Sequence, residues 1–186
     1  IEDDEIPEPD SVLSEKDLTK IKLSWNIGYA RCFHYFGEYV ASMYKRIPSK
    51  LLLRIPPIIH PASKHSIRGV YARMALNFSR RTIGYQRARL AKLLGRQARV
   101  SRRLYYKEMK ESKAVVSPFG WGEINNRDFE AFIYGCLLVK PSMSHIETFP
   151  PLFVDDETYI SYKWDLSNMI DVIREVEGNY KKYLEV

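Results

Sequence analysis

The 186-residue sequence predicts an α/β domain in which helices cover both faces of a parallel β-sheet. Two observations lead to this fold class. From residue 64 onward, short apolar runs alternate with longer stretches whose apolar residues recur with helical spacing. Between residues 114 and 134, an apolar run, a glycine-rich turn and a helical pattern follow one another. This order is typical of open α/β sheets, which bind ligands beyond the carboxyl ends of their strands.

The expected elements follow in chain order. The first 63 residues form an acidic tail and connector, with an expected strand at 20–26, a helix at 32–45 and an irregular, proline-rich stretch at 46–64. The α/β lobe, residues 64–186, has expected strands at 66–71, 98–101, 114–117, 136–140 and 158–162. Its expected helices lie at 83–94, 102–111, 126–134 and from a cap at Asp165 or Ser167 to about 184, with a turn or short helix at 144–148.

Composition narrows the class of protein. A hydrophobic fraction of 45% argues against extensive disorder. Cys32 and Cys136 have no spacing typical of a metal site, so we expect reduced thiols and a cytosolic protein. The apolar segment 51–59 is too short, and too interrupted by Arg54 and prolines, to span a membrane. Because the chain opens with Ile1 rather than Met, we expect it to be part of a longer protein.

Charge is distributed unevenly within the net value of +6. Residues 64–110 carry fourteen Lys or Arg and only one acid, Glu108. This basic stretch could meet the phosphates of a small ligand, an acidic glycan, a membrane surface or a nucleic acid. The alternative is a set of solvated helix faces balanced by the acidic tail. The chain has no signature of a known nucleic-acid-binding motif, which argues against that partner.

The loop after the expected strand 114–117 has the strongest chemical signal. Gly120 and Gly122 allow the backbone to approach a ligand closely. The helix that follows offers unpaired N–H groups to an anion at its start, near Arg127. Glu130, one turn further, is placed to accept hydrogen bonds from vicinal hydroxyls. Arg127 could contact a phosphate or form an ion pair with Glu130, three residues away. Together these residues predict a site for a nucleotide or nucleotide-sugar.

A second candidate segment, residues 141–148, follows the expected strand 136–140. Ser144 and Glu147 fit a capping box, and the same amides could face a diphosphate or a sugar. His145 could donate to a phosphate or a sugar hydroxyl, or be structural. Of the arginines, Arg68 at the expected end of the first strand and Arg87 in the following helix could neutralise a leaving diphosphate.

Three motifs carry a resemblance to a known family. They are Ser117-Pro-Phe-Gly-Trp-Gly-Glu, Arg127-Asp-Phe-Glu-Ala and Lys140-Pro-Ser-Met-Ser-His-Ile-Glu-Thr148. These motifs resemble a bacterial branch of the group-one glycosyltransferases, in which two Rossmann-like lobes face each other across a cleft (the GT-B architecture). The resemblance implies the carboxyl-terminal lobe, which binds a nucleotide-diphosphate sugar. It also implies that Glu130 is the later glutamate of the paired-glutamate motif and binds the donor ribose. Gly122 stands where many relatives have the earlier glutamate.

The resemblance implies transfer of the sugar to a hydroxyl of a glycan, lipid or protein. The acceptor site and any general base would come from an amino-terminal lobe that this chain lacks, so the catalytic residues stay unassigned. Such enzymes bind the donor without a metal ion or a further cofactor, and Asp155-Asp156-Glu157 is not a convincing metal site. P-loop, GxSxG and HExxH motifs are absent. The competing hypothesis is a non-catalytic module that binds an anionic polymer through residues 64–110.

Overall fold

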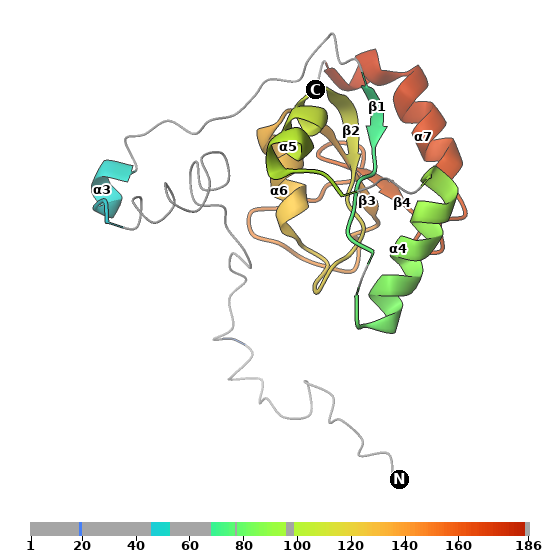
Figure 1. Cartoon of the computed structure of the whole chain (residues 1–186). Coiled ribbons are helices and arrows are strands. Elements are labelled where there is room, and N and C mark those ends of the chain that lie inside the picture. The colour runs from blue at the N-terminus through green and yellow to red at the C-terminus, as the bar shows by residue number, and fades with distance from the viewer. Residues whose placement is uncertain (1–18, 20–45, 53–67, 77, 96–98, 185–186) are drawn as a thin grey trace.

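The computed structural model describes residue 19 and the ranges 46–52, 68–76, 78–95 and 99–184 (Figure 1). The expected strand at 20–26, the expected helix at 32–45 and the boundary between the connector and the lobe lie outside these residues. Within the stretch predicted to be irregular, α3 (Ser49–Leu52) forms a single helical turn.

The sheet contains four parallel strands among the described residues. Strands β1 (Arg68–Tyr71), β2 (Ser112–Val116), β3 (Leu137–Pro141) and β4 (Ile160–Tyr162) lie in the order of the chain. Their register pairs Val70 with Ala114, Val115 with Leu138, and Val139 with Ile160. The predicted parallel sheet is therefore confirmed.

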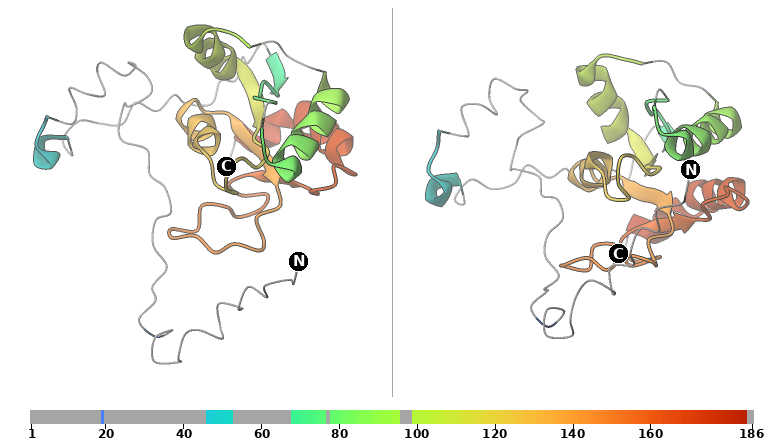
Figure 2. Two further views of the ribbon diagram at one scale, coloured as in Figure 1. Left: turned by 60° about the horizontal axis from the view of Figure 1, so that its bottom comes forward. Right: turned by 90° about the horizontal axis from the view of Figure 1, so that it is seen from below.

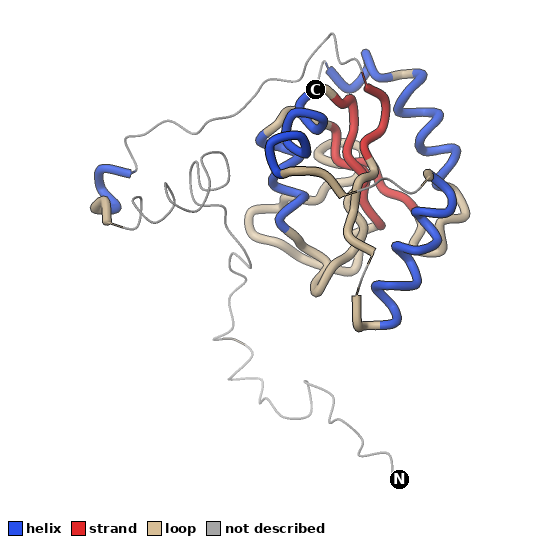
Figure 3. Tube along the Cα trace, in the orientation of Figure 1, coloured by secondary structure: helices blue, strands red, loops and turns tan. Residues whose placement is uncertain are grey.

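Helices cover both faces of this sheet. Helices α4 (Arg81–Leu94) and α7 (Met169–Gly178) lie on one face, whereas α5 (Arg102–Lys110) and α6 (Asn126–Ile133) lie on the other (Figure 1). A 3₁₀ helix, η2 (Tyr180–Leu184), follows α7, and a tube representation shows the helices flanking the central strands (Figure 3). The predicted Rossmann-like α/β fold is confirmed by this arrangement.

The alternation of side chains along the strands builds two cores. Ala114 and Val116 of β2 pack with Leu90 of α4 and Met169 of α7. Val115, between them in the sequence, points to the opposite face and packs in a second core with Met109 of α5 and Ala131 of α6. Both faces of β2 are thus buried, which explains its uninterrupted apolar sequence.

Two expected elements differ from the structure. Residues 99–101 form no strand, because Ser101 is instead the N-cap of α5 and accepts a hydrogen bond from the amide of Leu104 (3.3 Å). Helix α7 begins at Met169, not directly after Asp165 or Ser167. The Asp165 carboxylate accepts from the amide of Ser167 (2.9 Å) in a tight turn that includes Leu166 with φ 66°, so the helix starts later.

None of the helices in the described ranges combines the length and apolar character needed to cross a bilayer.

Two leucines of α4 provide a matched test of this packing. Leu90 is fully buried, whereas Leu93 is 42% exposed. We expect Leu90→Ala to lower the free energy of unfolding by about 2–5 kcal/mol, because it leaves a cavity in the core. We expect Leu93→Ala to change it by less than about 0.5 kcal/mol. Urea denaturation measures both values, and equal losses would contradict the position of α4 on the sheet.

Candidate functional site

A pocket of about 180 Å³ lies at the carboxyl edge of the sheet. The view from below in Figure 2 looks onto this edge. The start of α4 contributes one wall, the loop after β2 a second, and Trp164, after β4, a third. The lining residues are Arg80, Thr82, Ile83, Gln86, 119–123 and Trp164. Because parallel strands end at the same edge, loops that are distant in the sequence meet here.

In the loop after β2, several carbonyl groups accept hydrogen bonds, whereas a run of amides has no partner among the described residues. The carbonyl oxygens of Pro118 and Phe119 accept hydrogen bonds from Arg87, and that of Glu123 accepts one from Lys140. By contrast, the amides of residues 121–123 have no hydrogen-bond partner in the part of the chain that the structure describes. Consecutive free amides of this kind favour an anion.

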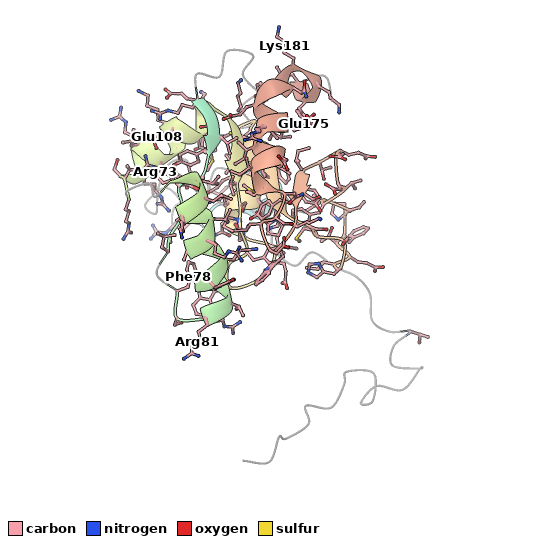
Figure 4. The ribbon with its side chains drawn as sticks, turned by 90° about the vertical axis from the view of Figure 1, so that its right-hand side faces the viewer. Arg73, Phe78, Arg81, Glu108, Glu175 and Lys181 are labelled. Carbon is pink, nitrogen blue, oxygen red and sulfur yellow. The ribbon has the colours of Figure 1, made fainter. Side chains whose placement is uncertain are left out.

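The start of α4 presents a second set of free amides to the same pocket. Its N-cap, Arg80, makes no side-chain capping bond, and the first turn has no acidic residue. The amides of residues 81–83 therefore have no acceptor among the described residues, and the helix dipole adds positive potential there. The Arg80 guanidinium lies over the Trp121 ring, 5.2 Å from its centroid. Figure 4 shows Phe78 and Arg81 at this end of α4, far from Glu175 and Lys181.

The sequence analysis placed an anion-binding helix start at α6, and the structure shows that this start is capped by its own side chains. Asn125 accepts from the amide of Arg127 (2.9 Å), and Asp128 accepts from the amide of Asn125 (3.0 Å), which completes a capping box. The start of α6 is thus occupied by its own side chains, whereas the start of α4 is open.

Arg87, predicted to neutralise a diphosphate, lies beneath the pocket. Its guanidinium donates to the carbonyl oxygens of Ala75 (3.0 Å), Phe119 (3.0 Å) and Pro118 (3.4 Å) and stacks on Phe78. Burial and, to a smaller extent, the charge of Arg127 lower the pKa of Arg87 to about 10, so the side chain is still cationic at neutral pH. Arg87 therefore joins the loops that follow β1 and β2.

Lys140 forms a second buried cation under the same loop, and sequence reasoning did not identify it. Its Nζ lies 3.1 Å from Oδ2 of Asp128 and also donates to the carbonyl oxygen of Glu123. Ser117 donates to Oδ1 of Asp128 (2.6 Å). Burial lowers the pKa of Lys140, and the Asp128 carboxylate opposes that decrease. The available signal was a lysine at the end of an otherwise apolar strand, Leu137–Pro141.

Glu130 and Arg127 face helix α5. Both carboxylate oxygens of Glu130 accept hydrogen bonds, from the hydroxyls of Tyr105 (2.9 Å) and Tyr106 (3.0 Å). Burial raises the pKa of both tyrosines, so they remain donors at neutral pH. Arg127 donates to the carbonyl oxygen of Val116 (3.2 Å) and, in the described part of the chain, forms no ion pair with Glu130. Glu130 does not line the pocket, and its contact with a ribose stays a prediction.

The remaining predicted residues lie in different places. Gly120 and Gly122 line the pocket. His145 is exposed in the loop after β3, and its ring packs edge-on against Phe119, which also lines the pocket. Ser144 lies in a turn and bonds to the Ser142 hydroxyl (3.2 Å), not in a helix with a capping box.

Arg68 begins β1, and the prediction that it ends this strand is wrong. It therefore lies at the amino edge of the sheet, opposite the pocket, where it pairs with Glu111 (3.4 Å) and Glu108 (3.8 Å). Arg73 also pairs with Glu108, and Figure 4 shows these two side chains facing each other.

No family model and no curated protein matches this chain. Among the described residues, no group of three His, Cys, Asp or Glu side chains is arranged to hold a metal ion.

The buried Lys140–Asp128 pair gives a stability prediction. Lys140→Met leaves the Asp128 carboxylate buried without its cation, so we expect a loss of about 3–5 kcal/mol of unfolding free energy. Combining it with Asp128→Asn should recover part of this loss, because the buried charge is removed. A double-mutant cycle by urea denaturation measures the coupling, and single-variant losses that simply add would refute it.

Glu130 gives a second prediction. Glu130→Ala removes the acceptor of two tyrosine hydroxyls, and we expect a loss of about 1–3 kcal/mol of unfolding free energy. In that background, changing Tyr105 and Tyr106 to Phe should cost little more. The same variant tests the ribose contact: stabilisation by UDP disappears if Glu130 holds the ribose and persists if Glu130 only joins α5 to α6.

Proposed function

We propose that this chain is the donor-binding lobe of a glycosyltransferase and that its pocket binds the diphosphate of a nucleotide-sugar. One observation carries the proposal: Thr82 and Ile83 of α4 and residues 121–123 of the loop after β2, whose amides have no partner among the described residues, line the same pocket as Arg80. Backbone amides, a helix dipole and a guanidinium are the groups that proteins use to bind phosphates. In an open α/β sheet, this edge is also where nucleotides bind.

The pocket also offers surfaces suited to rings. Trp121 is 66% exposed and Trp164 is 47% exposed, although both side chains are large and apolar. A sugar or a base could pack against them. The two glycines of the loop are not needed by the fold, because a Cβ at Gly120 or Gly122 would meet no atom closer than 3.7 Å or 3.9 Å. Their small size supports close approach of a ligand instead.

The chemistry requires stabilisation of a leaving group. During transfer, the bond between the sugar's anomeric carbon and the diphosphate oxygen breaks, and a bond to the acceptor oxygen forms. The acceptor hydroxyl gives its proton to a base, and the diphosphate leaves with an additional negative charge. Arg80 and the free amides would stabilise that charge. The volume of about 180 Å³ is below the range of complete ligand sites, roughly 300–1,000 Å³, which fits a site completed by a facing lobe.

A second candidate function is binding of an anionic polymer. All the charged residues on the exposed side of α5 are cations, namely Arg102, Arg103, Lys107 and Lys110. The acid of this helix, Glu108, is buried against arginines. Such a surface attracts polyanions at low salt.

A thermal-shift titration with UDP, GDP and dTDP tests the proposal. The matching nucleotide should stabilise the chain by about 2.7 kcal/mol at a hundredfold excess over its dissociation constant. Arg80→Ala should weaken binding roughly tenfold or more, because a charge-assisted hydrogen bond is lost. Arg81→Ala is the matched control, since Arg81 is the next residue and exposed but does not line the pocket.

Equal effects of the two arginine variants would contradict a role of the pocket. A chain that ignores all three nucleotides but binds heparin with a steep salt dependence would favour the polymer-binding function.

A further inference from the structure

Gln86 lines the pocket with a carboxamide that, among the residues that the structure describes, is hydrogen-bonded through its NH₂ group only. It is 3% exposed and lines the pocket on α4. Its Nε2 donates to the carbonyl oxygen of Trp164 (3.1 Å), and this bond sets the orientation of the carboxamide, since only the NH₂ group can donate to a carbonyl. Its Oε1 has no hydrogen-bond partner among the residues that the structure describes.

In the part of the chain that the structure describes, the hydroxyl oxygen of Tyr162 is a fully buried side-chain atom without a hydrogen-bond partner. Oε1 of Gln86 is not such an atom, so it is an acceptor that can be reached from the pocket. Here Oε1 belongs to a residue of the pocket wall, which Trp164 also lines. An open acceptor in the pocket wall suits a hydrogen-bond donor from a ligand. A phosphate oxygen cannot serve, because an ionised phosphate only accepts.

The position of Gln86 along α4 indicates which part of a ligand supplies the donor. Gln86 lies four residues after Thr82, on the same face of the helix and about one turn, or 5.4 Å, from the free amides. A ring attached directly to the diphosphate carries hydroxyl groups at that range. A nucleobase lies further away, because the ribose separates it from the phosphates.

We propose that Gln86 is a specificity-determining residue, whose Oε1 accepts a hydrogen bond from a hydroxyl of the sugar ring joined to the diphosphate. The proposal rests on the proposed function, because it takes the diphosphate at the start of α4 as given. It assigns the amides and Arg80 to the charge of the ligand, and Gln86 to the hydroxyl pattern of the ring. Sites that hydrogen-bond a hydroxyl discriminate strongly against ligands that lack it.

The test compares pyrophosphate, UDP and UDP-glucose, with the guanine series (GDP and GDP-mannose) in parallel, by calorimetric titration. In the wild-type chain, each added ring should tighten binding. Gln86→Met should leave the affinity for pyrophosphate within about twofold. It should reduce one of two gains in affinity, either that from pyrophosphate to UDP or that from UDP to UDP-glucose, about ten- to hundredfold. Loss of the step from UDP to UDP-glucose identifies the transferred sugar, and loss of the step from pyrophosphate to UDP identifies the ribose.

Lys92→Met is the matched control, because Lys92 is exposed in the last turn of the same helix and should change neither gain in affinity. If Gln86→Met weakens all three probes equally or changes neither gain in affinity, the proposal is overturned. If the wild-type chain binds none of the probes, the proposed function fails, and this inference with it. If Gln86→Met does not fold, the wild-type chain is titrated with monodeoxy forms of the ligand, each of which lacks one hydroxyl. One of them should bind at least tenfold more weakly than the parent ligand, and equal affinities overturn the proposal.

Discussion

Two buried cations beneath one loop hold the candidate site together. Arg87 and Lys140 donate to backbone carbonyl oxygens of residues 118, 119 and 123, and Lys140 also pairs with Asp128. Buried charges are costly unless their hydrogen bonds are satisfied, and here the loop supplies the acceptors. These bonds fix the position of the loop after β2, which lines the pocket and whose amides at residues 121–123 have no partner among the described residues. Buried side chains thus fix the position of a loop that lines the pocket.

Helix α4 connects this loop to the other walls. The adjacent residues Gln86 and Arg87 bind loops on either side: Gln86 bonds to Trp164, after β4, and Arg87 bonds to Ala75 and Phe119, after β1 and β2. One turn further, Leu90 anchors the helix in the core. The open start of α4 is therefore held at a defined position relative to the glycine-containing loop, which is what a preorganised anion site requires.

The elements that the sequence predicted well have a clear period or a local cap. Strands β1 to β4 and helices α4 to α6 lie within a few residues of their expected positions, since their apolar patterns report burial directly. The errors have local chemical causes. Ser101 belongs to a cap and not to a strand. Ser144 begins no helix, because residues 144 and 145 form a turn. The capping box seen in the structure is formed by Asn125 and Asp128, since asparagine and aspartate also serve as caps.

The sequence by itself determined the α/β architecture and the presence of a glycine-containing loop at the carboxyl edge of the sheet, because periodicity and turn chemistry are local properties. Only the tertiary structure decided which groups meet at that edge. Arg87 and Phe119 are 32 residues apart, and Lys140 and Asp128 are 12 apart, so their contacts depend on the packing of the chain. The same packing turned Glu130 toward the tyrosines of α5. The start of α6, by contrast, is closed by a local capping box, whereas that of α4 has none. The local sequence around a charged side chain does not indicate its partner, because the partner is set by how distant segments pack together.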